Sequence, residues 1–187
     1  MSFKNYFIKF QAIDANDDYI LRQVKIENDL EAYHEIYSDA DVMKYYEGGT
    51  TVTDKERVKT VLNNQIKEFE KARIYSWTIA DKKTDTAIGR ILLSNFESNN
   101  KIANLGYFIG KKHWGKGIAS AIISPVVTFG FECLLLERIY ARVAIDNIGS
   151  WKALEKNGFV KEGLIRHSFY LPDGLCDCYM YSRLFTD

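Results

Sequence analysis

A turn that can hold phosphate is the first chemistry that the sequence indicates. An apolar strand pattern over 106–110 leads into a basic turn with two glycines, Gly115 and Gly117, and then into a helical pattern. Because glycine tolerates positive φ, such a turn can lie close to a ligand while the first N–H groups of the helix point outward. The helix dipole adds about half a positive charge, and nearby lysines add whole charges, so a pyrophosphate suits the turn. These lysines are Lys111, Lys112 and Lys116.

The turn matches neither of two common phosphate-binding motifs. The nucleoside-triphosphate loop needs Gly-Lys-Ser or Gly-Lys-Thr, but Ile118 follows Gly117 here. The dinucleotide fingerprint needs Gly or Ala three residues after Gly117, where this chain has Ser120. A nucleotide-binding module is therefore disfavoured, and the turn on its own is also compatible with an ordinary helix start.

A second pattern about thirty residues downstream makes the interpretation specific. It consists of Asn147-x-x-Ser150 followed by Glu155-Lys156-x-Gly158-Phe159. Together with 107–119, it resembles the GNAT acetyltransferases, and within them the RimJ/RimL branch. Leu21-Arg22 and 39–45 are also similar to the early part of that branch. The resemblance covers nearly the whole chain and leaves about the first eighteen residues without a counterpart.

The resemblance implies both a fold and an activity. The fold is α+β, with a mixed, mostly antiparallel central sheet of about seven strands, helices on both faces, and a parallel strand pair splayed at the cofactor site. The activity is direct transfer of an acetyl group from acetyl-CoA to a primary amine in a ternary complex. The acceptor is a protein N-terminal amine, including a ribosomal one, or a small amine. Relatives are often dimers, so a homodimer is included among the expectations.

The resemblance also assigns residues to the cofactor. Two are expected to be catalytic: Asn147 contacts the pantetheine arm, and Ser150 donates a hydrogen bond to the leaving thiolate. Other branches use a Tyr where this chain has Leu154. On spacing alone, a plain N-cap role is favoured for Ser150, and Trp114 is equally compatible with packing under the loop. The expected cofactor-binding residues are Phe108, Ile109, Trp114, Gly115, Lys116, Gly117, Ile118, Ala119, Asn147 and Ser150.

The proton acceptor of the reaction is left open. An amine must be neutral to attack a thioester, and a strand N–H at Phe108 or Ile109 is expected to meet the oxyanion. Many relatives carry a Glu where this chain has Asn104, which makes a non-catalytic coenzyme A sensor the alternative function. His167 has a suitable intrinsic pKa but favours a structural or acceptor-site role, and Asp177 can equally anchor a hairpin. The candidates for acceptor binding or proton transfer are Glu97, His167, Asp177 and Tyr170, the last through a bound water.

Composition bounds the remaining function classes. The 187 residues carry 25 basic and 25 acidic side chains, so no global field favours nucleic acid or an acidic membrane as a partner. With 47% hydrophobic residues, one domain over 1–187 is expected. Three cysteines without a signal peptide pattern favour a reducing cytoplasm. Neither Cys176-x-Cys178 nor the scattered histidines fit a metal site, so no metal is expected.

Periodicity predicts the elements that position these residues. We expect strands over 75–80, 87–96 and 102–110 in an antiparallel meander, then a helix from Lys116 to a parallel strand over 138–144. Pro125 should bend or break that helix. The other expectations are a strand over 19–26, a helix to Tyr37 capped by Asn28 or Asp29, a helix to Ala72 capped by Thr53 with Glu56, a helix over 150–157 closed by Gly158, a hairpin over 159–169 and 175–184, and an arm or extra strand within 1–18.

Overall fold

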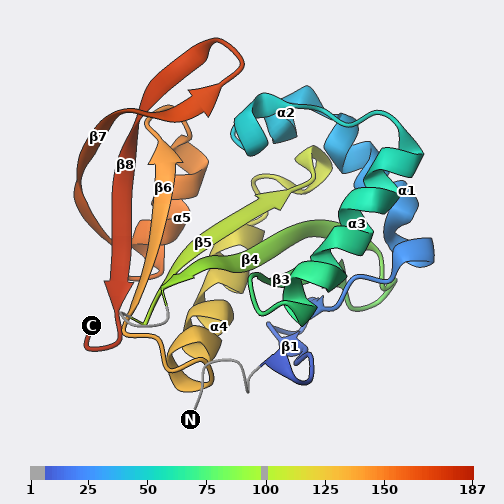
Figure 1. Cartoon of the computed structure of the whole chain (residues 1–187), viewed down its shortest axis with the longest axis horizontal. Coiled ribbons are helices and arrows are strands. Elements are labelled where there is room, and N and C mark those ends of the chain that lie inside the picture. Colours follow the sequence, from blue (N-terminus) through green and yellow to red (C-terminus); the bar gives the residue numbers. More distant parts are fainter. Residues whose placement is uncertain (1–6, 98–100) are drawn as a thin grey trace.

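The computed structural model describes residues 7–97 and 101–187, except for the side chain of residue 47, and contains one mixed sheet with helices on both faces (Figure 1). The sheet has eight strands in the order β1-β2-β3-β4-β5-β6-β8-β7, and all neighbours are antiparallel except β5 and β6. The strands are β1 (Ile13–Asp14), β2 (Tyr19–Arg22), β3 (Tyr75–Asp81), β4 (Ala87–Glu97), β5 (Ile102–Ile109), β6 (Arg138–Ala144), β7 (Val160–Leu171) and β8 (Gly174–Leu184). The predicted α+β class, meander and parallel pair are confirmed, with one strand more than expected.

The helices divide into two sets that cover opposite faces of the sheet. Phe108 packs under α1 and α3, whereas its neighbour Ile109 joins the core on the α4 side. This division follows from the alternation of side chains along a strand. The helical elements are α1 (Ile26–Ser38), α2 (Ala40–Met43), η2 (Glu47–Gly49), α3 (Lys55–Glu70), η3 (Lys111–His113), α4 (Ile118–Glu132) and α5 (Ile148–Lys156).

Strands β5 and β6 diverge along their length. They pair only from Ile102↔Arg138 to Asn104↔Tyr140, while β5 stays paired to β4 as far as Ile109. The separation therefore begins after Asn104, about four residues earlier than the expected point at Phe108 and Ile109. The free edge of β5 beyond Asn104 opens a wedge between the two strands, and this wedge contains the candidate site.

The start of α1 differs from the sequence expectation. The helix begins at Ile26 with Lys25 in the N-cap position, so the expected cap at Asn28 or Asp29 is wrong. Asp29 lies within the first turn, where it is buried and accepts hydrogen bonds from Arg22 at 2.7 and 2.8 Å. Its carboxylate is used in a buried ion pair that ties α1 to β2.

The start of α3 is shifted by one residue. Asp54 is the N-cap, and its Oδ1 accepts a hydrogen bond from the backbone N–H of Arg57 at 2.7 Å. The expected capping box of Thr53 and Glu56 is therefore wrong. The backbone oxygen of Thr53 lies instead 2.7 Å from Nε2 of His34, which links the loop before α3 to α1.

Helix α4 runs unbroken from Ile118 to Glu132 with Pro125 inside it, so the expected break does not occur. Ile123, two residues before the proline, and Val126, directly after it, are fully buried, and their packing holds the helix together. Ala121, whose carbonyl loses its partner to the proline, is partly exposed. No helix within the described ranges is long and apolar enough to cross a membrane.

The segment before β2 packs against the core on the α4 side. Phe7 is buried, with its ring centroid 5.4 Å from that of Phe69 and 5.2 Å from that of Tyr75. Phe10 touches the same two rings, and β1 adds a short edge strand. The expected arm and extra strand both exist in the described part, while residues 1–6 lie outside it.

Candidate active site

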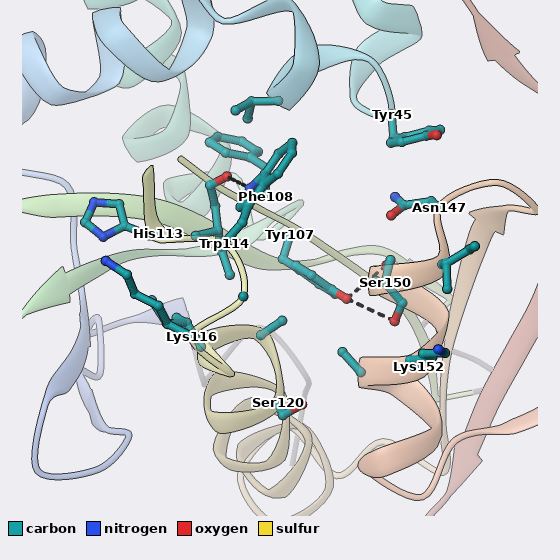
Figure 2. Close-up of a pocket in the computed structure, with 18 of the residues that line it drawn as sticks. Tyr45, Tyr107, Phe108, His113, Trp114, Lys116, Ser120, Asn147, Ser150 and Lys152 are labelled. Carbon is teal, nitrogen blue, oxygen red and sulfur yellow. Dashed lines mark hydrogen bonds between the residues drawn. The ribbon is translucent and has the colours of Figure 1, made fainter. Parts of the chain in front are cut away.

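A cavity of about 560 Å³ lies where the free end of β5 meets the first turns of α4 and α5 (Figure 2). The structure brings all ten sequence-predicted cofactor residues together around this cavity. They come from two stretches, 108–119 and 147–150, because the crossover through α4 returns the chain beside its starting strand. We call this space the first cavity.

The turn before α4 is open in the way that phosphate requires. Gly115 and Gly117 both have φ of 73°, and a Cβ at either position would meet nothing within 4 Å. Gly117 is the N-cap of α4, and the N–H of Ala121 donates to its carbonyl oxygen at 3.2 Å. The N–H groups of 118–120 precede this first helical bond, so they remain available for an anion. These residues therefore fit a pyrophosphate.

The positive charge at the turn is smaller than the sequence suggested. Nζ of Lys111 lies 2.6 Å from the Asp41 carboxylate, and Nζ of Lys112 lies 2.7 Å from that of Glu35. Both lysines are thereby drawn toward α1 and α2. Lys116 has no ion pair among the described residues, and its side chain lies beside the turn in Figure 2. The sequence argument counted the charges of all three lysines toward the turn, but two of these charges are paired with carboxylates.

Trp114 fastens the turn to the end of β5. Its indole Nε1 donates to the backbone oxygen of Ile109 at 2.7 Å, and the side chain is 49% exposed while lining the first cavity. Trp114 can thus both pack under the loop and contact the cofactor, as the two interpretations of this residue proposed. His113 also lines the cavity, and burial together with Lys116 and Lys112 lowers its pKa.

The backbone of β5 presents a free N–H group to the cavity. Gly110 N–H donates to Ile88 O at 2.9 Å, so the opposed pair Gly89↔Ile109 is of the type without mutual hydrogen bonds. In such a pair the N–H groups point away from the partner strand. Ile109 N–H is therefore directed from β4 toward the wedge, whereas that of Phe108 faces β4. Of the two expected oxyanion donors, the geometry favours Ile109.

A hydroxyl pair lies at the centre of the site. Ser150 is the third residue of α5 and not its N-cap, and its own N–H donates to Asn147 O at 3.0 Å. Ser150 Oγ lies 2.9 Å from the hydroxyl of Tyr107, as the dashed lines in Figure 2 mark. The Asn147 side chain makes no capping bond and lies beside this pair. Ser150 therefore does not cap α5, and its hydroxyl is oriented by the hydrogen bond with Tyr107.

Tyr107 is a site residue that sequence reasoning missed. Burial raises the pKa of its phenol to about 12, although the hydrogen bond with Ser150 opposes the rise. The phenol is consequently protonated at physiological pH. The only available signal was strand alternation, which places Tyr107 on the same face of β5 as Ile109.

A second cavity, of about 420 Å³, adjoins the first. It extends along the opposite face of the wedge to Arg90, Ser94 and Asn104, and Phe169 of β7 forms part of its wall. The residues that line both cavities are Tyr45, Tyr46, Tyr107, Asn147 and Ser150. The two cavities thus meet at the hydroxyl pair.

The tip of the β7–β8 hairpin bends toward α2 (Figure 1). Tyr170 lies against Gly48, and Pro172 lies so close to Gly49 that a Cβ there would be 2.3 Å from its ring. Asp177 anchors the hairpin, since its Oδ1 accepts the backbone N–H of His167 at 2.9 Å.

None of the four residues predicted at the acceptor site lines either cavity. His167, Tyr170 and Asp177 lie in the hairpin, and the first two of these are exposed. Glu97 pairs with Ile102 at the end of β4, three residues beyond Ser94, the last residue of β4 that lines the second cavity. No group of three or more potential metal ligands occurs among the residues that the structure describes.

A helix start suited to an anion, a free strand edge and a hydroxyl pair, all lining the first cavity, are the features expected of an acyl-coenzyme A-dependent transferase. A family model described as "Acetyltransferase (GNAT) domain" matches residues 18–160. The chain therefore belongs to the GNAT family, and it is an acetyl-CoA-dependent acetyltransferase.

Three similar proteins illustrate the range of relatives. N-acetyltransferase p20 of Bacillus licheniformis, described as uncharacterized, is 34% identical over 166 residues, which cover 88% of this chain and 91% of the relative. Ribosomal-protein-serine acetyltransferase of Escherichia coli K12 is 30% identical over 102 residues, covering 54% and 57%. A solved ribosomal-protein α-N-acetyltransferase in complex with coenzyme A has a TM-score of 0.83 at 20% identity, covering 93% and 98%, and shares the fold.

Proposed function

We propose that the protein transfers the acetyl group directly from acetyl-CoA in the first cavity to a primary amine in the second. The observation that carries this proposal is that the two cavities meet at Ser150 and Tyr107. Both substrates can then be present together, so no acetylated enzyme is needed. The acceptor class is a protein N-terminal amine or a small amine, and the ribosomal-protein relative supports the first.

The cofactor would lie with its pyrophosphate on the turn at Gly115 and Gly117 and its pantetheine arm beside Asn147. This orientation directs the thioester toward the end of β5. The neutral amine attacks the carbonyl carbon, and the oxyanion accepts a hydrogen bond from Ile109 N–H. As the C–S bond breaks, the Ser150 hydroxyl donates a hydrogen bond to the departing thiolate, which then takes its proton from solvent because a free thiol has a pKa of about 8.5.

The proton that the amine loses passes to water in this proposal. No carboxylate among the described side chains lines the second cavity, and Asn104 there donates to Ser94 Oγ at 3.4 Å. The rate is therefore expected to follow the neutral fraction of the amine. A plot of log kcat/KM against pH should rise with a slope near one up to the pKa of the acceptor. A plateau starting near pH 6.5 would instead indicate an enzyme base such as histidine.

The first test separates an enzyme from a sensor. Acetyl-CoA at 100 times its dissociation constant should stabilise the fold by about 2.7 kcal/mol, or roughly 5–10 °C, whereas ATP and NAD should not. Thiol release is then measured with a panel of peptides and small amines. A non-catalytic coenzyme A sensor, the alternative raised by Asn104, would give the melting shift but release no thiol with any amine. The homodimer and the cytoplasmic location remain predictions.

A further inference from the structure

We infer that the second cavity selects an amine that also carries a carboxylate, and that Arg90, assisted by Arg142, binds this anion. The inference rests on the proposed function, because it assumes that the acceptor amine lies beside Ser150. It adds the chemical class of the acceptor, for which the cavity provides positively charged lining residues. Neutral alkylamines and diamines are correspondingly poor substrates.

Arg90 is a buried cation whose described partners are neutral. Its side chain is 5% exposed and forms part of the cavity wall. Nε donates to Ser76 Oγ at 2.6 Å, and Nη1 donates to the Tyr46 hydroxyl at 3.0 Å. These hydroxyls orient the guanidinium, but they do not neutralise its charge. Leaving a buried charge without a counterion is unfavourable, so the site gains from an anionic ligand.

Arg22 provides the contrast within the same molecule. It is 6% exposed, almost the same as Arg90, and it serves a structural purpose. Its guanidinium contacts the carboxylates of both Asp29 and Asp85, at 2.7 and 2.6 Å. For Arg90, no carboxylate among the described side chains lies within ion-pair distance. Arg22 thus has two carboxylate counterions, whereas Arg90 has none among the side chains that the structure describes.

The charged side chains that line the second cavity are all positive among the described residues. Of its described lining residues, Arg90 and Arg142 are the charged ones, and no Asp or Glu belongs to the wall. Arg142 is exposed and lies 3.5 Å from Ser168 Oγ, so it can turn toward a ligand at little cost. A cationic second group on the acceptor would be repelled here. A carboxylate can accept two hydrogen bonds from one guanidinium, which makes it the fitting anion.

The positions of Arg90 and its neighbours on β4 and β5 determine how such an acceptor would lie in the cavity. Arg90 is directly opposite Phe108, and Ser94 is directly opposite Asn104, so all four lie on one face of the wedge. Tyr107 and Ser150, which form the hydroxyl pair, line the same cavity. An acceptor held by its carboxylate at Arg90 therefore extends its amine toward the thioester. Peptides with an acidic residue near the N-terminus and short ω-amino acids share this chemistry.

The experiment on the wild-type protein compares matched acceptors. 4-Aminobutyrate, its amide and 1,4-diaminobutane present the same amine on chains of similar length, and the C-terminally amidated peptide Ser-Asp-Ala is compared with amidated Ser-Asn-Ala. With acetyl-CoA at saturation, thiol release should give at least a tenfold higher kcat/KM for the carboxylate member of each set. Equal or higher kcat/KM for the amide or the diamine would overturn the inference while leaving acetyl transfer itself intact.

Two variants test the residues without risking the core around Arg90. Asn104→Asp places a carboxylate in the second cavity at nearly unchanged volume, with Asn95→Asp on the exposed part of β4 as the control. Arg142→Gln is compared with Arg166→Gln, since both arginines are exposed but only the first lines the cavity.

Asn104→Asp should lower kcat/KM for the carboxylate acceptor and raise it for the diamine, reversing the preference. Arg142→Gln should raise KM for the carboxylate acceptor severalfold and leave the amide unaffected. Unchanged selectivity in both variants would overturn the inference. A failure of all amines to release thiol, with acetyl-CoA still raising the melting temperature, would instead overturn the proposed function.

Discussion

The two cavities that meet at Ser150 are constructed in different ways. The first depends mainly on backbone groups from one continuous stretch, 108–119, with the start of α5 as its other wall. The second depends on side chains from several strands, α5 and the β7–β8 hairpin. Recognition of the invariant cofactor is thus local in the sequence, whereas recognition of the acceptor is distributed. The second cavity can change its specificity by side-chain replacement without disturbing the first.

The largest expected effect tests the backbone character of the first cavity. Gly117→Glu places a carboxylate at the open turn, where the pyrophosphate would lie, and should weaken acetyl-CoA binding more than 100-fold by repulsion. Gly117→Ala adds only a methyl group in open space, with strain from its positive φ of about 1 kcal/mol. Titration calorimetry should therefore show a much smaller loss for alanine. Equal losses would mean that backbone conformation, not anion binding, is the sensitive property.

The next effect tests the junction of the cavities. Ser150→Ala should keep acetyl-CoA affinity and lower kcat by about 10- to 100-fold, because the thiolate loses its donor. Since Ser150 is not a cap, the melting temperature should change little. Tyr107→Phe retains the ring and should lower kcat less. Normal turnover in Ser150→Ala, measured by thiol release, would contradict the role of the hydroxyl pair.

A smaller effect distinguishes free from paired charge at the turn. Lys116→Ala should raise the dissociation constant for acetyl-CoA by about two- to fivefold at low salt, and the effect should shrink at high salt. Lys112→Ala should change it less, because Glu35 already pairs with that ammonium group. If the two variants weaken binding equally, the ion pair with α1 does not persist in the complex.

The smallest expected effect concerns the hairpin that forms part of the second cavity. The Arg138 guanidinium, bonded to Glu162, lowers the pKa of that carboxyl from its ordinary 4.5 to about 2. The pair's stabilisation is thus present above pH 4.5 and is lost as the pH falls toward 2. Because the pair is partly exposed, Glu162→Gln should cost less than about 1 kcal/mol at pH 7. Melting curves of the two proteins should converge by about pH 2 to 3, and a constant difference would exclude linkage to Glu162.

The sequence predicted the first cavity better than the second, because the residues of the first are close together in the chain and those of the second are not. The turn, the Asn147-x-x-Ser150 pattern and the parallel pair were readable because each depends on residues close together in the chain. The partners of Lys111 and Lys112 were not, since Asp41 and Glu35 are about seventy residues earlier. Short-range patterns contain no information on such ion pairs.

The acceptor region illustrates the same limit. Glu97 was a candidate proton acceptor, but it lies three residues beyond Ser94, the last residue of β4 that lines the second cavity. Arg90 was overlooked because a single arginine in an apolar strand has no distinctive spacing. Its meaning depends on burial and on the identity of its neighbours, which only the folded arrangement supplies.

The most direct test of the two-cavity account is a crystal structure of the protein with coenzyme A and 4-aminobutyrate. The account predicts the pyrophosphate on the N–H groups of 118–120, the thiol within hydrogen-bonding distance of Ser150 Oγ, and the carboxylate on Arg90. A thiol directed away from Ser150, or an amino acid bound outside the second cavity, would contradict it.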